Sequence, residues 1–258
     1  MPDEHQVAPR SGGTQQSAED VSFFDRFVES HGDYDVLHDV AYRRLVSVFE
    51  RWIVPRAGEH CIDLGCGTGA FTRRLRHFGL RLEGMDVSPA AIEYASGHAA
   101  GEKFLVGDLK RSGLPSDDYH IVVYSGVLHH FPSSAERSEA LREGYRLLAS
   151  GGRLFAFDPN QHSPSMWLYR DPRSPLYSTK GKITSEVLLR REQLRSELES
   201  AGFTGVSVRG VSGIGYRYVE SPTARLLLPL YNIYEQVIRR SPFESILGTF
   251  LVSVAHKR

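Results

Sequence analysis

The chain is poor in cysteine and has no excess of either charge. Its 258 residues include two cysteines, Cys61 and Cys66, and no further Cys or His pair stands at metal-site spacing. This pattern excludes a disulfide-stabilised scaffold, and we expect reduced, packed thiols and no metal. Lysine plus arginine equals aspartate plus glutamate at 31 each, so the composition gives no electrostatic signature of a nucleic-acid partner.

Long hydrophobic runs are also missing. No stretch reaches the roughly 20 apolar residues of a transmembrane helix. Residues 1–20 are polar, rich in Gly, Ser, Gln and Pro, and lack the apolar core of a signal peptide. We therefore expect a disordered tail over 1–20, one domain over 21–258, and a cytoplasmic protein without stable membrane insertion.

Strand and helix patterns alternate regularly through the middle of the chain. Two helical patterns come first, within 23–28 and 36–49, and the later segments predict strands at 60–64, 81–86, 103–106, 120–124, 153–157, 206–209 and 248–255, with helices at 71–78, 88–99, 133–149, 184–200 and 226–238. Gly151 and Gly152 are expected to stop the helix that ends near 149. Repeated β-α units with apolar strands predict a mostly parallel sheet with right-handed crossovers.

The most specific motif follows the first predicted strand. Asp63 ends that strand, and Gly65, Gly67 and Gly69 follow at alternate positions. Glycine accepts positive φ and lacks a Cβ, so the loop can turn tightly and let a ligand approach its backbone. A dinucleotide fingerprint reads G-x-G-x-x-G, whereas this loop reads D-x-G-x-G-x-G. Its carboxylate would repel a pyrophosphate and attract an ammonium group.

Two more carboxylates recur one β-α unit apart, Asp86 at the end of the second predicted strand and Asp108 after the third. Ligands of an open parallel sheet bind beyond the carboxyl ends of the strands. With these acids and the glycine loop, residues 23–255 resemble a class I methyltransferase that uses S-adenosylmethionine (SAM). The resemblance implies a Rossmann-like α/β fold, with a seven-stranded, mostly parallel sheet whose last strand is antiparallel, helices on both faces, and a helical and loop cap built from 21–50, 158–182 and 210–247.

The same resemblance assigns SAM contacts to individual residues. The glycine loop would meet the methionyl part, the first acid its ammonium group, the second acid the ribose hydroxyls, and the third acid the adenine amine. The residues so implied are Asp63, Gly65, Cys66, Gly67, Gly69, Asp86, Val87, Asp108, Leu109, Ser125 and Gly126.

Three histidines are candidates for proton transfer. Methyl transfer is a direct displacement at a sulfonium methyl group, so the enzyme mainly aligns the reactants and excludes water. A base is needed only for a hydroxyl or a protonated amine. His129 and His130 follow the fourth predicted strand and His162 follows the fifth, and histidine can take a proton near neutral pH. A structural role for these histidines stays open.

Aromatic residues are dense in the three cap segments and suggest a small, apolar or aromatic acceptor from specialised metabolism. O-methylation is favoured over N- or C-methylation, and the run Leu226–Leu230 could touch a lipid-like substrate. The alternatives are a non-catalytic SAM-fold binding protein and, less favoured by the loop spacing, a nicotinamide-dependent oxidoreductase. A homodimer contact through the aromatic residues also stays open.

Overall fold

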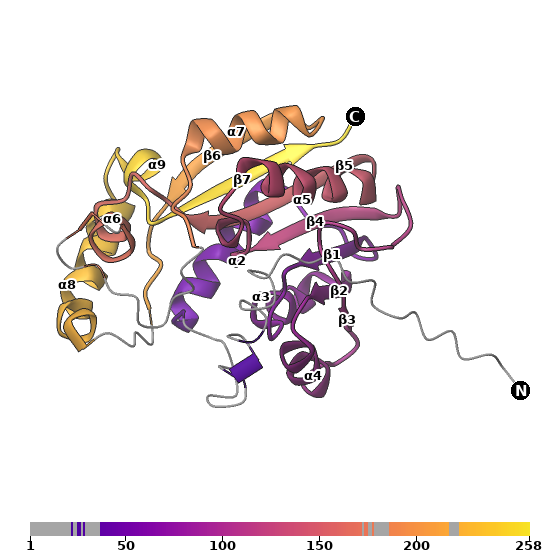
Figure 1. Ribbon diagram of the computed structural model, residues 1–258, viewed down its shortest axis with the longest axis horizontal. Coiled ribbons are helices and arrows are strands. Elements are labelled where there is room, and N and C mark those ends of the chain that lie inside the picture. Colours follow the sequence, from indigo (N-terminus) through magenta and orange to yellow (C-terminus); the bar gives the residue numbers. More distant parts are fainter. Residues whose placement is uncertain are drawn as a thin grey trace, which may run out of the picture.

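The computed structural model describes a seven-stranded sheet with helices on both faces (Figure 1). It covers residues 22, 25, 26, 28, 37–171, 173, 174, 177, 186–216 and 222–258. The expected tail over 1–20 lies outside the described residues, as do most of the first expected helix and parts of the three expected cap segments.

The strands follow the order β3-β2-β1-β4-β5-β7-β6. Their bounds are β1 His60–Leu64, β2 Arg81–Asp86, β3 Lys103–Val106, β4 Tyr119–Ser125, β5 Leu148–Pro159, β6 Thr204–Val211 and β7 Phe250–His256. The first five pair in parallel, and β7 is antiparallel to both β5 and β6. This confirms the fold class expected from the sequence. The order reverses between β1 and β4, so their carboxyl ends flank the switch point where ligands of such sheets bind.

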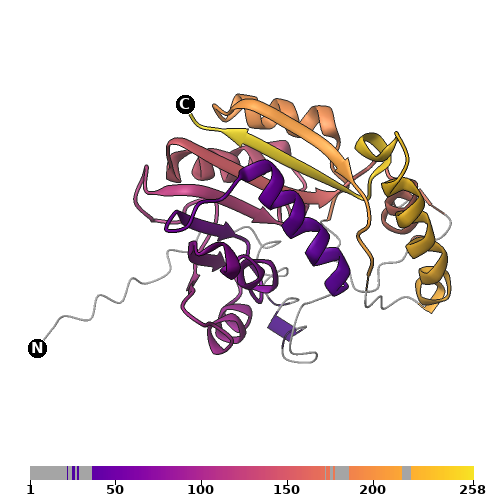
Figure 2. The ribbon, with the colours of Figure 1, turned by 180° about the vertical axis from the view of Figure 1, so that it is seen from behind.

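The two faces of the sheet bury separate cores because side chains alternate along each strand. Ile62, Val122 and Leu154 point to the face covered by α5 (Ser134–Leu147) and α7 (Arg191–Ser200). Cys61 and Val123 point to the opposite face, under α2 (Asp39–Ile53) and α3 (Ala70–Arg74). Figure 2 shows α2 lying along this second face. Both cysteines are free and buried, as expected, and burial raises the pKa of each thiol.

Local capping explains where two of the helices begin. Ser88 accepts a hydrogen bond from the Ala91 amide at 3.1 Å and caps α4 (Pro89–Gly97), whose first residue is a proline. Ser133 and Glu136 form the predicted capping box of α5. Both helices begin at the residues that the sequence indicates.

The glycine pair after α5 does not stop that helix, contrary to expectation. The helix ends at Leu147, and β5 already begins at Leu148, so both glycines lie inside the strand. Gly151 has a φ of +76° and its amide donates to the carbonyl of Lys257, whereas a Cβ on Gly152 would lie 2.8 Å from the carbonyl oxygen of Ala149. The positive φ of Gly151 and the close backbone packing at Gly152, not helix termination, require these glycines.

Three further elements differ from expectation. The helix expected at 71–78 divides into α3 and a 3₁₀ turn, Arg76–Phe78, and the helix expected from 184 begins at Arg191. Part of the loop expected over 158–182 is helix α6 (Pro164–Arg170). Its proline stands in the first helical turn, where proline is favoured because the missing N–H has no partner within the helix. Helix α8 (Pro222–Arg239) keeps Pro229 in its interior, and α9 (Glu244–Leu247) follows it. Within the described residues, no helix is long and apolar enough to cross a membrane.

Candidate active site

The glycine loop after β1 is fixed by hydrogen bonds to the end of β2. The amides of Gly65 and Cys66 donate to the carbonyl of Met85 at 2.7 and 3.1 Å, and φ is positive at all three glycines. A Cβ on Gly65 would lie 2.4 Å from the side chain of Val127, whereas a Cβ on Gly67 would meet nothing within 4 Å. Gly65 is therefore required by packing against the segment after β4. Gly67 instead borders open space in which a ligand can approach the backbone.

Asp63 lies beneath this loop and is completely buried. Thr72 donates a hydrogen bond to its Oδ2 at 2.6 Å, while Oδ1 has no hydrogen-bond partner among the described residues. Burial raises the pKa of this carboxyl to about 6, and hydrogen bonding from Thr72 and from Ser125 at the end of β4 partly opposes that shift. A buried carboxyl whose hydrogen bonds are incomplete suits a ligand donor such as an ammonium group. Direct contact of Asp63 with SAM stays a prediction.

Asp86 joins the end of β2 to the glycine loop. Its Oδ2 accepts from the Gly67 amide at 2.8 Å and its Oδ1 from the Ser88 amide at 3.0 Å. Burial raises the pKa of this carboxyl, and the two amide hydrogen bonds oppose the shift. Val87 follows as an exposed apolar side chain. A carboxylate beside an open apolar surface fits a ribose with its base, as the sequence predicted.

One residue at this edge was missed by the sequence analysis. The hydroxyl of Ser88 donates to Asp25, and the negative charge of Asp25 contributes to the raised pKa of Asp86. The N-terminal segment therefore reaches the proposed ribose site. Only the helical pattern around 23–28 hinted at an ordered element there, and nothing in the sequence linked it to Asp86.

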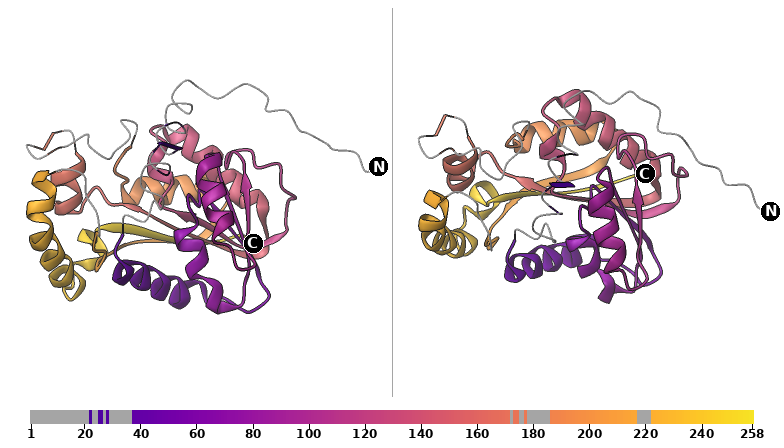
Figure 3. Two further views of the ribbon diagram at one scale, coloured as in Figure 1. Left: turned by 90° about the horizontal axis from the view of Figure 1, so that it is seen from below. Right: turned by 60° about the horizontal axis from the view of Figure 1, so that its bottom comes forward.

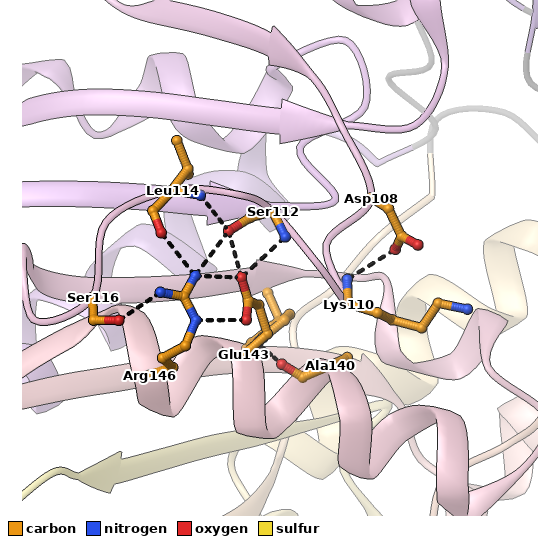
Figure 4. A network of polar contacts seen from close by, with 9 residues as sticks. Asp108, Lys110, Ser112, Leu114, Ser116, Ala140, Glu143 and Arg146 are labelled. Carbon is orange, nitrogen blue, oxygen red and sulfur yellow. Dashed lines mark hydrogen bonds and ion pairs between the residues drawn. The ribbon is translucent and has the colours of Figure 1, made fainter. Parts of the chain in front are cut away.

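Asp108 begins the loop after β3 and remains exposed, while Leu109 is buried beside it. The Lys110 amide donates to Oδ1 of Asp108 at 2.9 Å, which fixes the turn (Figure 4). A separate network holds the rest of this loop against α5, because Glu143 accepts from the Ser112 amide at 3.0 Å and pairs with Arg146. The loop is thus anchored while the carboxylate of Asp108 stays accessible.

The end of β4 provides the other side of the switch point. Ser125 pairs with Phe157 of β5, and Gly126 follows with a φ of +73°. Both residues are partly exposed. A Cβ on Gly126 would lie 3.4 Å from the Phe157 ring, which is tight but not prohibitive. Ser125 is the last residue of β4 and Gly126 follows it, a position compatible with the predicted sulfonium side, and the contact with SAM stays a prediction.

His129 and His130 lie in a 3₁₀ turn after β4, and their ring centroids are 4.1 Å apart. His129 is buried, and its Nδ1 lies 2.9 Å from Oδ1 of Asp158, which also accepts the His129 amide at 3.0 Å. Burial lowers the pKa of His129 to about 4 and that of His130 to about 3, and it raises the pKa of Asp158 to about 8. Both imidazoles are therefore neutral at neutral pH.

Glu186 and Arg170 complete this cluster, and the sequence analysis missed both. Arg170 forms an ion pair with Glu186, and the charges of both act on the two histidines. Ligand atoms of His129, His130 and Glu186 lie within 4.8 Å of one another, a grouping compatible with a divalent metal. The sequence analysis expected no metal, and the pairing of Glu186 with Arg170 competes with one.

His162 is separate from this cluster. Its side chain is exposed, and its amide donates to the side-chain oxygen of Asn160 at 3.0 Å. Asn160 is itself buried and donates to the carbonyls of Ile246 and Gly248 at 2.9 and 2.7 Å. Among the described residues, the group of close ligand atoms around His129 and His130 includes Glu186 but not His162. The structure thus brings together two of the three histidines that the sequence singled out.

The chain is similar to known methyltransferases in sequence and in fold. Residues 62–156 match the family model described as a methyltransferase domain. A malonyl-[acyl-carrier protein] O-methyltransferase from Serratia marcescens is 28% identical over 166 residues, which cover 61% of this chain and 64% of that protein. A ubiquinone biosynthesis O-methyltransferase from Nitrosococcus oceani is 26% identical over 150 residues, covering 56% of this chain and 61% of that protein. The chain therefore aligns with less than two thirds of either relative.

The fold is also that of a solved methyltransferase. A Thermotoga maritima protein, described as a SAM-dependent methyltransferase and possible histamine N-methyltransferase, superposes with a TM-score of 0.65 at 18% identity, over 92% of this chain and 99% of that one. The domain match covers β1 to β5, the strands whose carboxyl ends carry the glycine loop and the acids described above. Together, the domain match and these residues mark residues 62–156 as a methyltransferase domain, and the rest of the chain completes the fold that SAM-dependent methyltransferases share.

Proposed function

We propose that the protein transfers the methyl group of SAM to a hydroxyl of a small, apolar or aromatic molecule. The observation that carries this proposal is the buried pair of His129 and Asp158 at the switch point of the sheet, 2.9 Å apart. An amine nucleophile in its free-base form needs no base, whereas a hydroxyl must lose a proton during attack. A neutral, oriented imidazole beside the sulfonium side is what an O-directed transfer requires.

The cofactor is held, in this proposal, by the three strand ends. Asp63 would accept from the ammonium group, Asp86 from the ribose hydroxyls and Asp108 from the adenine amine. Bound SAM supplies an electrophilic methyl group on a sulfonium. The glycine loop contributes backbone that a ligand can approach closely, most clearly at Gly67, where no side chain or backbone atom stands within 4 Å of a Cβ position.

The proposal places the proton of neutral His129 on Nδ1. Oδ1 of Asp158 then accepts from Nδ1 as well as from the His129 amide. A neutral imidazole that carries its proton on Nδ1 leaves Nε2 as the proton acceptor. Asp158 thereby positions His129, in the way that a buried carboxylate orients a catalytic imidazole in other enzymes. His130, also neutral, is partly exposed beside it.

The acceptor would lie between these histidines and the described part of the cap. Tyr216 contacts Met166 of α6, with its hydroxyl 3.8 Å from the sulfur, and its ring lies 5.5 Å from that of Tyr231 in α8. Burial raises the pKa of Tyr216, so its hydroxyl stays protonated. We assign 21–50, 158–182 and 210–247 to the cap that selects the acceptor. The names of the two relatives, both O-methyltransferases, support the choice of oxygen.

A methyl-transfer assay with labelled SAM tests this proposal. Phenols, catechols, carboxylic acids, amines and thiols are offered separately, with product formation as the readout and SAM binding measured in parallel by calorimetry. We expect transfer to at least one hydroxyl compound. Exclusive transfer to amines or thiols would contradict O-methylation. SAM binding without transfer to any class would favour a non-catalytic SAM-binding protein.

A further inference from the structure

Helix α8 carries an apolar stripe that faces away from the protein. Leu226, Leu230, Ile233 and Val237 are 78%, 63%, 61% and 61% exposed, and their spacing of four, three and four residues places them on one side of the helix. Figures 1 and 3 show α8 at one end of the molecule, with one side turned to solvent. Single exposed hydrophobic residues are ordinary, but a contiguous stripe of four marks an interaction surface.

The orientation of the stripe is fixed by the opposite side of the helix. Tyr231 is buried and donates to the carbonyl of Ile214 at 2.7 Å. Glu235, one turn later, is buried as well and accepts from the amides of Gly213 and Ile214 at 2.9 and 3.1 Å. These hydrogen bonds hold Tyr231 and Glu235 against the protein. A rotation of α8 that buried the stripe would break them. The apolar side of α8 therefore faces solvent, while the side with Tyr231 and Glu235 faces the protein.

The exposed charges of this segment are all positive. Within 222–247 the exposed charged side chains are Arg225, Arg239 and Arg240. Arg240 lies next to Ile233 and Val237 of the stripe, whereas Arg239 packs against Gly213 on the opposite side of the helix. Of the two carboxylates in that range, Glu235 is buried and Glu244 is paired with Arg44 at 3.0 Å. Since the whole chain carries equal numbers of acidic and basic residues, this is a local excess.

Further apolar side chains are exposed past the end of the helix. Phe243 and Ile246 are exposed in the segment that follows α8. A shallow hollow, lined by Asn232, Ile233, Gln236, Val237 and Arg240, lies beside the stripe and is almost entirely apolar. The arrangement is an apolar strip bordered by arginines, as in helices that lie in the interface of an anionic bilayer.

We propose that this surface of α8 binds the face of an anionic lipid membrane, with the helix parallel to the bilayer plane. The apolar stripe would enter the acyl boundary while the arginines meet the headgroup phosphates. A second copy of the chain is a poorer occupant, because a two-fold contact through the stripe would bring the arginine-bearing ends of two helices together. This binding surface is independent of the acceptor proposed above, and methyl transfer does not enter its test.

Sedimentation of the full-length protein with lipid vesicles tests the proposal. Vesicles of phosphatidylcholine alone are compared with vesicles that contain phosphatidylglycerol as well. We expect retention on the anionic vesicles and little on the neutral ones. The variant Leu230→Gln/Ile233→Gln should lower the partition by about tenfold or more, because two apolar side chains leave the acyl boundary. The variant Arg240→Gln should lower it by about fivefold, the effect expected of one arginine near the membrane surface.

Val54→Gln is the matched control, since Val54 is an equally exposed apolar residue on another part of the surface. It should bind vesicles like the wild type, and all variants should keep the wild-type unfolding temperature because the altered side chains are exposed. Equal retention of wild type and the Leu230→Gln/Ile233→Gln variant would overturn the proposal. So would a wild-type dimer, detected by light scattering, that becomes monomeric in this variant without any vesicle binding.

Discussion

The Nδ1 atom of His129 lies 2.9 Å from Oδ1 of Asp158, and both side chains are buried at the carboxyl end of the sheet. Burial disfavours separated charges, which is why the pKa of His129 falls to about 4 while that of Asp158 rises to about 8. The pair therefore stays close to neutral around physiological pH. Such a pair can orient an imidazole without charging it, and this is the property on which the proposed proton transfer depends.

Replacing Asp158 with leucine tests that positioning role. Leucine has a similar volume but offers no oxygen that could hold the imidazole proton on Nδ1. We expect the turnover number to fall by about 100-fold or more, the range of a lost general base, while the dissociation constant of SAM stays unchanged. Steady-state kinetics on the acceptor identified by the methyl-transfer assay, with calorimetry for SAM, separates the two effects. An unchanged turnover number would show that His129 is structural.

His162→Ala is the natural counterpart because His162 is exposed and lies outside the His129 cluster. We expect near-normal turnover in this variant and a large loss in His129→Ala. The opposite ranking would show that the exposed histidine moves toward the acceptor on binding. Circular dichroism of both variants checks that each remains folded.

The sheet was predictable because strands β1 to β4 are short apolar segments punctuated by glycine, proline and acids. The site around Asp86 followed from the same logic, since parallel strands deliver their ends to one edge. The buried ion pair of Arg137 is an example of a feature that the sequence did not predict. Arg137 lies in α5, an amphipathic helix, yet it is almost fully buried and pairs with Glu197 at 2.8 Å, sixty residues later. No local periodicity encodes such a partner.

The cap shows a second limit of sequence reasoning. Glu186 was expected in the helix at 184–200 and Arg170 in the loop over 158–182. A loop has no periodic pattern that places its side chains, so their ion pair beside the histidines could not be predicted. Pro164 misled in the same region, because it begins a helix where a loop was expected. Tertiary packing determines whether such segments become helical, whereas intrinsic helix propensities describe only the isolated chain.

Asp86 should dominate cofactor binding. Its two oxygens already accept the Gly67 and Ser88 amides, so the carboxylate is oriented before any ligand arrives. Asp86→Ala removes an acceptor that would serve two ribose hydroxyls, and hydrogen bonds to charged groups contribute about 1.5–3 kcal/mol each. We expect SAM affinity to fall by at least about 100-fold in calorimetry. Unchanged affinity would refute the assignment, and a normal unfolding temperature shows that the loss is not due to misfolding.

Two glycines with similar backbone strain separate ligand contact from conformational cost. Gly67 and Gly113 have φ values of +53° and +71°, and a Cβ on either would meet nothing within 4 Å. Alanine at either position should therefore lower the free energy of unfolding by a similar amount, about 1–2 kcal/mol. Only Gly67→Ala places a methyl group at the approach to the loop, so only it should weaken SAM binding. Equal affinities in the two variants would mean that the ligand does not approach Gly67.

Glu235 predicts a pH dependence of stability that its glutamine variant lacks. The carboxyl is buried and accepts from two backbone amides and from the hydroxyl of Thr249. Burial raises its pKa from 4.5 to about 7, and the three hydrogen bonds only partly oppose this. The folded state thus binds a proton that the unfolded state releases over this range, so stability is fully present below pH 4.5 and falls as pH rises through about 7.

Glutamine at position 235 is uncharged at every pH and can still accept the amide of Gly213 through its side-chain oxygen. The free energy of unfolding of Glu235→Gln, relative to wild type, should therefore increase by up to about 3 kcal/mol between about pH 5 and about pH 8.5. Urea denaturation at several pH values measures this difference directly. If the gap between variant and wild type stayed constant across the range, Glu235 would be ionised in the fold, and solvent or a cation would have to reach it between α8 and β7.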